Sequence, residues 1–334
     1  MNEKKERMIF DVTYQPQVRT VRDTQRIMLD VIIATLPIVG FGVYRYGWHA
    51  LLLVVSSMAA AVFFEWAYRR LLKKSITIDD LSAAVTGLLL VMVLPPQTPV
   101  WMVVIGDFFA IVIVKQLYGG IGKNFLNPAL AGRAFLTASY SGVLTVVMID
   151  GVTAATPLGY MYSDTPIPFP LAQNFFGAIP GSVGEISSFC ILAGAAYLIA
   201  RKVIRWRIPL SVIGTVFFVS LIFGHSGYGH FEWALHNVFA GGVMFTGIFM
   251  ATDYATSPVT INGQIIYGIG IGLLTMLIRY FGGYAEGCSY AILIMNLCTG
   301  AIDKGCHRRQ FGVSKEEFFA QKRAKKNAKK EAAS

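Results

Sequence analysis

The chain has 334 residues, of which 54% are hydrophobic and only 14% are charged. A soluble globular protein carries about 25% charged residues, so this chain lacks the polar surface that would keep it in water. The composition excludes a secreted enzyme, a disordered regulator and a cytosolic nucleotide-binding domain. Apolar runs recur along most of the length, which predicts an all-α polytopic membrane protein.

The net charge of +10 comes from 29 basic and 19 acidic residues. The basic residues gather before the first apolar run, in two loops and in a lysine-rich tail, which is typical of the cytoplasmic side of a membrane protein. This distribution argues against nucleic acid as a partner. We interpret the segment 315–330 as a solvated arm, with contact to anionic lipid as an alternative.

A membrane-spanning helix needs about 20 mostly apolar residues. Ten segments fit, at roughly 27–45, 48–68, 81–95, 100–118, 129–149, 185–201, 208–224, 233–251, 265–281 and 286–302. Basic residues follow the even-numbered spans, so both termini are expected in the cytoplasm. No Lys or Arg stands between Arg133 and Arg201, so the long loop 150–184 is expected on the outer side.

Two sequence matches suggest that the halves of the chain are related. Thr86-Gly87 and Thr246-Gly247 each precede a proline, and residues 116–120 match residues 279–283 at an offset of 163. Five spans in each half make the second half inverted, as in many transporters. The expected divisions are an arm (1–26), a first repeat (27–149), the loop, a second repeat (185–302) and a tail (303–334). Because glycine and threonine are common in membrane helices, chance similarity is the alternative.

The outer loop opens with a short polar motif, Asp150-Gly-Val-Thr153-Ala-Ala-Thr156 followed by Pro157. Proline biases the preceding residue towards an extended backbone, so the Thr156 hydroxyl is expected to be presented to another molecule. Asp150 and Thr153 are expected to order the turn through side-chain to backbone hydrogen bonds. The alternative is an ordinary helix end followed by a turn.

This motif resembles the flavinylation motif D-x-x-[ST]-G-A-T, whose last threonine carries FMN through a phosphoester bond. A second segment, Gly119-Gly-Ile-Gly-Lys-Asn-Phe-Leu-Asn127-Pro-Ala129, resembles the stretch before the fifth span of the same family. From about Arg22 to Phe311 the chain resembles the family of the D subunits of bacterial Rnf complexes and the B subunits of sodium-pumping NADH:quinone oxidoreductases. The short arm before the first span favours the Rnf branch.

The resemblance implies that Thr156 carries covalent FMN, with Asp150 and Thr153 as recognition residues for a flavin transferase. The sequence departs from the motif at Ala154, where glycine is usual and where a positive φ would strain alanine. A second, non-covalent flavin such as riboflavin is a further expectation. No catalytic side chain is assigned.

The implied function is that of a membrane subunit that relays electrons through FMN. The complex would couple ferredoxin:NAD⁺ electron transfer to Na⁺ or H⁺ translocation across the bacterial inner membrane. Implied partners are the iron–sulfur and NADH-binding subunits, a second subunit with covalent FMN, small membrane subunits and the bilayer. The alternative is an inverted-repeat transporter or channel without a redox role.

Ionisable residues at membrane depth are candidates for an ion path or flavin contact. These are Glu65, Asp107, Lys115, Arg133, His236, Asp253 and Glu286. Glu232 and the histidines at 225, 230 and 236 match no compact zinc motif, so we expect no metal site. The four cysteines form no CxxC pair, so we expect neither a disulfide framework nor a self-contained iron–sulfur site.

Overall fold

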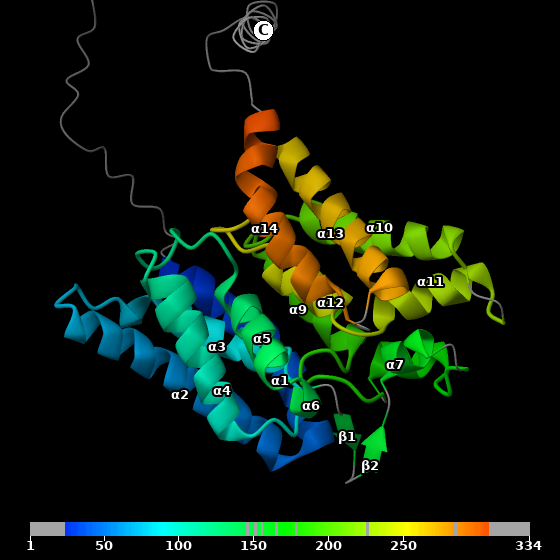
Figure 1. Ribbon diagram of the computed structural model, residues 1–334, viewed down its shortest axis with the longest axis horizontal. Helices are drawn as coiled ribbons and strands as arrows, with labels where there is room; N and C mark the ends of the chain where they lie inside the picture. Colours follow the sequence, from blue (N-terminus) through cyan, green and yellow to red (C-terminus); the bar gives the residue numbers. More distant parts are fainter. Residues whose placement is uncertain are drawn as a thin grey trace, which may run out of the picture.

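The computed structural model describes residues 24–306, apart from short gaps at 145–146, 150–151, 155, 164–165, 178, 225–226 and 283–285. Most of these residues are helical (Figure 1). The helices of the first half, drawn in blue to blue-green, lie mainly on one side of the molecule. Those of the second half, drawn in green to orange, lie mainly on the other.

The first half begins with two long helices, which are separated by Gly47 at a φ of +73°. Shorter helices follow, and one of them changes to a π-helix in its second part. The elements are α1 (Thr24–Tyr46), α2 (Trp48–Leu71), η1 (Ile78–Asp80), α3 (Ser82–Met92), α4 (Val100–Phe108), η2 (Phe109–Gln116), α5 (Pro128–Ser139) and α6 (Ser141–Leu144).

The loop between the halves contains a small antiparallel hairpin, β1 (Val147–Ile149) and β2 (Val152–Ala154), in which Val147 is opposite Ala154. Two one-to-two-turn helices follow, α7 (Pro157–Tyr162) and α8 (Leu171–Phe176). The fifth predicted span, 129–149, was therefore too long. Tyr140 interrupts the helix, and residues 147–149, of which Val147 and Ile149 are β-branched, pair as a strand.

The second half again contains a broken helix. Its elements are α9 (Ser188–Ala200), α10 (Arg207–Ile222), α11 (His230–Phe239), α12 (Val243–Phe245), η3 (Thr246–Met250), α13 (Ile261–Phe281) and α14 (Cys288–Gly305). The axis bends by 66° between α11 and the α12–η3 segment. Glycines at 241 and 242 occupy the bend, and Gly241 has a φ of +68°, a conformation that glycine adopts without strain.

Each of the ten apolar segments predicted from the sequence contains a helix. Among the described residues, three helices are long and apolar enough to cross a membrane: α1, α2 and α13. The bent pair α11 and α12–η3 makes a fourth if it counts as one span. The chain is therefore a helical, multi-pass membrane protein.

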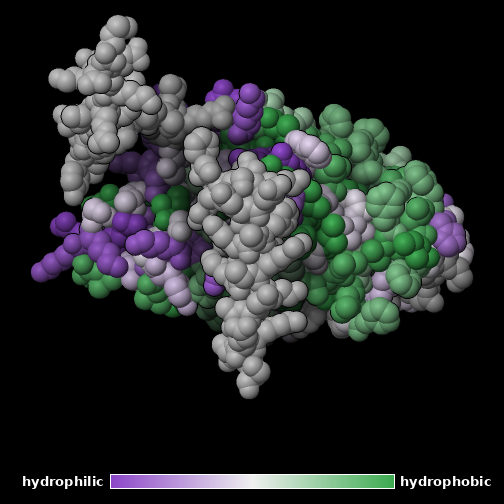
Figure 2. Space-filling model, turned by 90° about the horizontal axis from the view of Figure 1, so that it is seen from above, coloured by the Kyte–Doolittle hydropathy of each residue, from purple (hydrophilic) through white to green (hydrophobic). Residues whose placement is uncertain are grey.

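The distribution of apolar side chains fits a lipid environment. All of α3 is buried, so this helix forms the centre of the first half. Large side chains such as Tyr44, Trp48 and Phe281 are 74% to 84% exposed. Figure 2 shows hydrophobic residues over much of the right-hand part of the coloured surface, with most of the hydrophilic ones towards the left and the upper edge. Such a continuous apolar exterior is stable against lipid rather than water.

Candidate functional site

Thr156 caps the N-terminus of α7. Its φ and ψ are −68° and 159°, and its Oγ1 accepts a hydrogen bond of 3.1 Å from the backbone N–H of Gly159. Pro157 takes the first helical position, where its missing N–H is no loss. The predicted extended backbone before Pro157 is confirmed. Thr156 is partly exposed, and the cap uses a lone pair of Oγ1 rather than its hydrogen.

The helix that follows Thr156 is docked onto the second half. Leu158 is 3% exposed and contacts Gly241, at the bend between α11 and α12; a Cβ at Gly241 would collide with Leu158. Beyond α7, the backbone N–H of Ile167 donates a hydrogen bond of 2.6 Å to the Tyr228 hydroxyl. Thr156 is thus held beside the broken helix.

The other motif residues are only partly described. Asp150 lies outside the described residues, and Thr153 lies in β2, opposite Met148. Ala154 is also in β2, where the backbone is extended and any residue fits. The departure from glycine at this position therefore brings no backbone strain.

A group of buried and partly buried charges lies near the bend. Arg133 of α5 donates hydrogen bonds to Glu286 and, at 2.5 Å, to the Ser289 hydroxyl. Its Nη1 is 3.9 Å from Oε1 of Glu185. Arg279 of α13 belongs to the same group, since its charge also acts on Glu185 and Glu286. We call these four residues, Arg133, Glu185, Arg279 and Glu286, the outer cluster.

Arg279 holds the bend in place. Its Nη1 donates to the carbonyl of Asn237 at 2.6 Å, and its Nη2 donates to the carbonyl of Ala240 at 3.1 Å. These carbonyls belong to the C-terminal end of α11, which has no helical N–H partners for them. A guanidinium there satisfies the carbonyls and complements the helix dipole.

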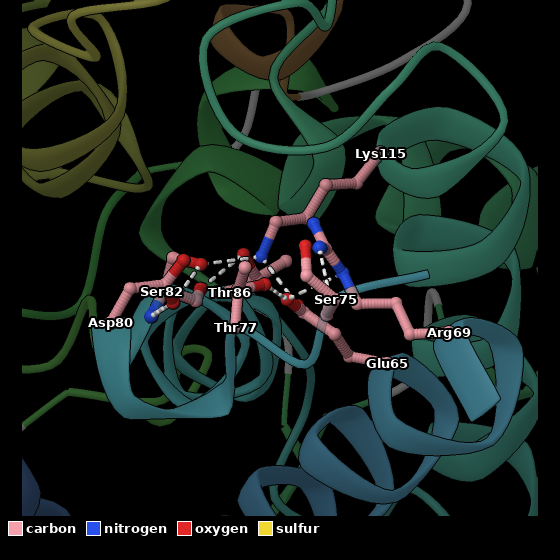
Figure 3. A network of polar contacts seen from close by, with 8 residues as sticks. All are labelled: Glu65, Arg69, Ser75, Thr77, Asp80, Ser82, Thr86 and Lys115. Carbon is pink, nitrogen blue, oxygen red and sulfur yellow. Dashed lines mark hydrogen bonds and ion pairs between the residues drawn. The ribbon is translucent and has the colours of Figure 1, made fainter. Parts of the chain in front are cut away.

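A second group of buried charges joins α2, η2 and the start of α3 (Figure 3). Lys115 Nζ lies 2.7 Å from Glu65 Oε2 and donates to the Ser82 hydroxyl at 2.6 Å. Thr77 donates to Glu65 Oε1 at 3.0 Å, and Arg69 Nε is 3.7 Å from the same oxygen. We call Glu65, Arg69, Thr77, Ser82 and Lys115 the inner cluster.

The glycine-rich segment found in the sequence packs against the inner cluster. Gly120 has a φ of +93°, and a Cβ there would lie 2.7 Å from Arg69 Nη2. Glycine is needed for both reasons, the left-handed backbone and the close approach of the guanidinium. The segment then ends at Asn127, whose Oδ1 accepts from the backbone N–H of Leu130 and caps α5.

The remaining ionisable candidates have structural partners. Ser57 donates to Asp107 Oδ1 at 2.9 Å, while Thr256 donates to Asp253 Oδ2 at 3.1 Å. His236 Nδ1 bonds the Asn174 amide nitrogen at 2.7 Å. His225 lies outside the described residues. In the described part of the chain, no three His, Cys, Asp or Glu residues gather as metal ligands.

A cavity lies between the two halves, beside the inner cluster. Its polar lining comes from both halves: Ser82, Thr86, Lys115, Asn124, Asn127 and Asp253. Its other walls are apolar, with Val85 and Leu89 on one side and Phe249 on the other. An apolar cavity with a few convergent polar groups is typical of a cofactor site.

Glu185 is not among the candidates named from the sequence. It stood as the first residue of a predicted span, 185–201, among residues that form a turn before α9. Its burial depends on α11–α12 and α5, which are distant in the sequence. An acid beside an apolar span with no Lys or Arg for 15 residues on either side was the available signal.

Comparison with known proteins places the chain in a family. The model of the NQR2, RnfD, RnfE family matches residues 11–312. The chain is 45% identical to the D subunit of the Na⁺-translocating ferredoxin:NAD⁺ oxidoreductase complex of Acetobacterium woodii, over 91% of this chain and 96% of the relative. It is 41% identical to the D subunit of the proton-translocating ferredoxin:NAD⁺ oxidoreductase complex of Clostridium ljungdahlii, over 91% and 97%.

A further relative is the D subunit of the ion-translocating oxidoreductase complex of Shewanella amazonensis, 35% identical over 91% of this chain and 99% of that protein. The identities and the coverage are high enough to decide the family, and they agree with a multi-pass helical fold. The chain belongs to the NQR2, RnfD, RnfE family.

Proposed function

We propose that this chain is the D subunit of an Rnf complex, which couples ferredoxin:NAD⁺ electron transfer to the translocation of Na⁺ or H⁺. The names of its relatives support the complex and the reaction. The chain would act as one subunit of this translocase and would not be catalytically complete alone. Because one of these relatives is named for Na⁺ and the other for protons, either cation remains part of the proposal.

The proposed redox group is FMN, held by a phosphoester to Thr156. The observation that carries it is the Thr156 hydroxyl at the start of α7, partly exposed and docked beside a broken helix. The residues fit an ester, because the cap to Gly159 uses an oxygen lone pair that an ester oxygen retains. Asp150 and Thr153 would be read by the flavin transferase. When bound, FMN supplies one- and two-electron chemistry, and this chain supplies its position.

We further propose that ten spans form two inverted repeats, 27–149 and 185–302. The arm (1–26) precedes them, the outer loop (150–184) connects them and the tail (303–334) follows them. Matching contacts support the repeat. The first half packs α2 on α3, α2 on α4 and α4 on α5, while the second packs α10 on α11, α10 on α13 and α13 on α14. The equivalent helices α1 and α9, and α5 and α14, contact each other across the halves.

The proposed location is the bacterial inner membrane, with both termini in the cytoplasm and the Thr156 loop on the outer side. The distribution of basic residues supports this orientation. The proposed partners are the iron–sulfur and NADH-binding subunits, the second subunit with covalent FMN, the small membrane subunits and the surrounding lipid.

The cavity beside the inner cluster supports a second, non-covalent flavin such as riboflavin. Its apolar walls suit an isoalloxazine ring, and the amides of Asn124 and Asn127 offer both hydrogen-bond donors and acceptors. Because the cavity draws residues from both repeats, its position matches that of transporter sites at a repeat interface.

The covalent flavin is tested by peptide mass spectrometry on the chain co-expressed with a flavin transferase. We expect an FMN-sized mass on the Thr156 peptide, absent in Thr156→Ala. Ser163→Ala, which removes a hydroxyl at the other end of α7, is the matched control and should keep the mass. An unmodified Thr156 beside an active transferase would contradict the redox role and favour an inverted-repeat transporter or channel without flavin.

A further inference from the structure

We propose that Glu185 is a binding site for a monovalent cation, H⁺ or Na⁺, at the bend between α11 and α12 that α7 also contacts. The proposal rests on the ion-translocating function proposed above and names a residue that takes part in it.

Glu185 is 2% exposed, and its carboxylate oxygens make no hydrogen bond of good geometry among the described residues; the polar groups that lie against them are the Ser182 hydroxyl and the Glu286 carboxyl. The hydroxyl of Ser182, on the same turn, is also buried. The backbone N–H of Glu185 donates to the Ser182 carbonyl at 3.1 Å, and the Ser182 hydroxyl lies against the Glu185 carboxylate. Three oxygen atoms that could bind a cation therefore lie together.

The charged groups around Glu185 are already engaged, and the nearest acid, Glu286 of the outer cluster, faces it with a like charge. From α5, Arg133 donates to Glu286 and Ser289 and is 3.9 Å from Glu185. From α13, Arg279 donates to the carbonyls of α11. Tyr46 of α1 and Cys288 of α14 also face this region; the Tyr46 hydroxyl donates to the Gly181 carbonyl at 2.7 Å.

An ionised carboxylate that is buried without donors is costly, and such groups are normally paired or bound to a cation. If Arg133 is matched with Glu286, the charge of Glu185 is balanced only at a distance, by Arg133 and Arg279. A proton on Glu185, or a Na⁺ held by its oxygens and the Ser182 hydroxyl, removes the unsolvated charge. Hard oxygen ligands suit Na⁺ as they suit other hard cations.

The position in the fold agrees with this role. Glu185 packs against Gly242, where a Cβ would lie 2.5 Å from Oε1, so the carboxylate touches the bend itself. Broken helices at membrane depth are where transporters place their ion sites. Leu158 of α7 contacts the same bend through Gly241. A movement of α7 and the binding of a cation at Glu185 would therefore both act on the bend between α11 and α12.

The binding test uses dicyclohexylcarbodiimide, a lipid-soluble reagent that modifies protonated carboxyls, on the intact complex, with peptide mass spectrometry as the readout. We expect labelling of Glu185 and none at this position in Glu185→Gln. Protection by NaCl but not by KCl identifies Na⁺. Labelling that falls with rising pH and ignores Na⁺ identifies H⁺. Absence of label on Glu185, while other peptides are labelled, overturns the proposal.

Transport by the complex in proteoliposomes provides the second measurement, as ions moved per electron transferred from reduced ferredoxin to NAD⁺. Glu185→Gln should lower this ratio about tenfold, because glutamine offers no carboxylate to bind the cation. Glu232→Gln, which removes an acid that is 55% exposed on the first turn of α11, should leave it unchanged. An unchanged ratio in Glu185→Gln overturns the proposal.

Folding and flavinylation are controlled separately. The FMN mass on Thr156 should persist in Glu185→Gln, so a failure of the cation site is distinguished from a failure of the flavin proposal. If Glu185→Gln does not assemble, Glu185→Asp and Ser182→Ala take its place. The first keeps a carboxylate and should keep the label, while the second should weaken Na⁺ protection or shift the pH at which labelling falls. The proposal is overturned if Ser182→Ala keeps the labelling and the transport of the wild type and Glu185→Asp shows no label.

Discussion

At the scale of single residues, the inner cluster shows what a buried charge requires. Glu65 and Lys115 are both almost fully buried, and each also contacts a hydroxyl, from Thr77 and Ser82 respectively. Removing two ions from water costs several kcal/mol each, and their attraction offsets this cost only with good geometry and further hydrogen bonds. Breaking such a pair leaves one charge without compensation.

We therefore expect Glu65→Ala and Lys115→Ala each to lower the free energy of unfolding by about 3–5 kcal/mol. The double variant Glu65→Gln/Lys115→Met should lose less than the sum of the two single losses, because no unpaired charge remains. Thermal unfolding of the purified subunit, followed by size-exclusion chromatography, measures the effect. Arg70→Ala, which removes an exposed charge from α2, is the control. Losses no larger than that of Arg70→Ala would show that the pair is not structural.

At the scale of elements, polar side chains define where the short helices begin. Asn127 caps α5 through Leu130 and donates through Nδ2 to the carbonyl of Met250 at 3.2 Å, at the end of η3. One residue thus begins a helix of the first half and satisfies a carbonyl of the second. The cavity proposed for the second flavin lies beside it.

Replacing Asn127 should separate these two roles. Asn127→Asp keeps the cap oxygen but loses the donor to Met250, which leaves a buried carbonyl at a cost of about 1–3 kcal/mol. Asn127→Ala loses the cap as well, for about 1 kcal/mol more. Unfolding temperatures of the two variants give the comparison. Equal temperatures for Asn127→Ala and wild type would rule out both contributions.

Close packing of α10 against α13 depends on glycine. A Cβ at Gly272 would lie 2.6 Å from Thr215 Cβ and 3.1 Å from the Val212 carbonyl. Small residues allow membrane helices to approach closely and are common where they pack. Gly214 on α10 is a matched contrast, since a Cβ there would have no atom within 4 Å.

Gly272→Ala should destabilise the chain by about 1–3 kcal/mol, because the methyl group forces the two helices apart. Gly214→Ala should be neutral or stabilising by up to about 1 kcal/mol, since alanine is the better helix former. Thermal unfolding of both variants measures the two changes in stability for comparison. Similar effects from the two changes would mean that the α10–α13 contact does not limit stability.

At the scale of the whole molecule, the two halves place a basic residue in the same way. Lys115, at the end of η2, donates to Ser82 at the start of α3. Arg279, near the end of α13, donates to the end of α11, at the bend that precedes α12. In the proposed inverted repeat these are the fourth and third helices of each half. The inner and outer clusters would then be equivalent positions on opposite sides of the membrane.

This arrangement predicts which loops face outwards. In intact cells, Ser163→Cys after α7 should react with a membrane-impermeant maleimide, whereas Lys73→Cys after α2 should react only when the cells are opened. Peptide mass spectrometry distinguishes these sites from the four native cysteines. Reaction of Lys73→Cys in intact cells would contradict the proposed orientation.

Much of the fold could be predicted from the sequence, because the signals are local. Apolar runs place helices at each of the ten predicted segments, and proline after Thr156 predicts its extended backbone. The fifth segment was the exception, since strand pairing at 147–149 depends on a partner strand. The number of spans was harder to predict, because several helices are too short to cross the thickness of a bilayer and one is bent by 66°.

The sequence by itself determined that this is a basic, helical membrane protein with a threonine motif in a long loop. It also indicated most of the ionisable residues that prove to be buried, such as Glu65 and Asp107. Only the tertiary structure decided which of them meet, because Glu65 and Lys115 are 50 residues apart and Arg133 and Glu286 are 153 apart. The burial of Glu185 was hidden for the same reason. A charge next to an apolar run can face water, lipid or protein, and only the packing of distant helices settles which.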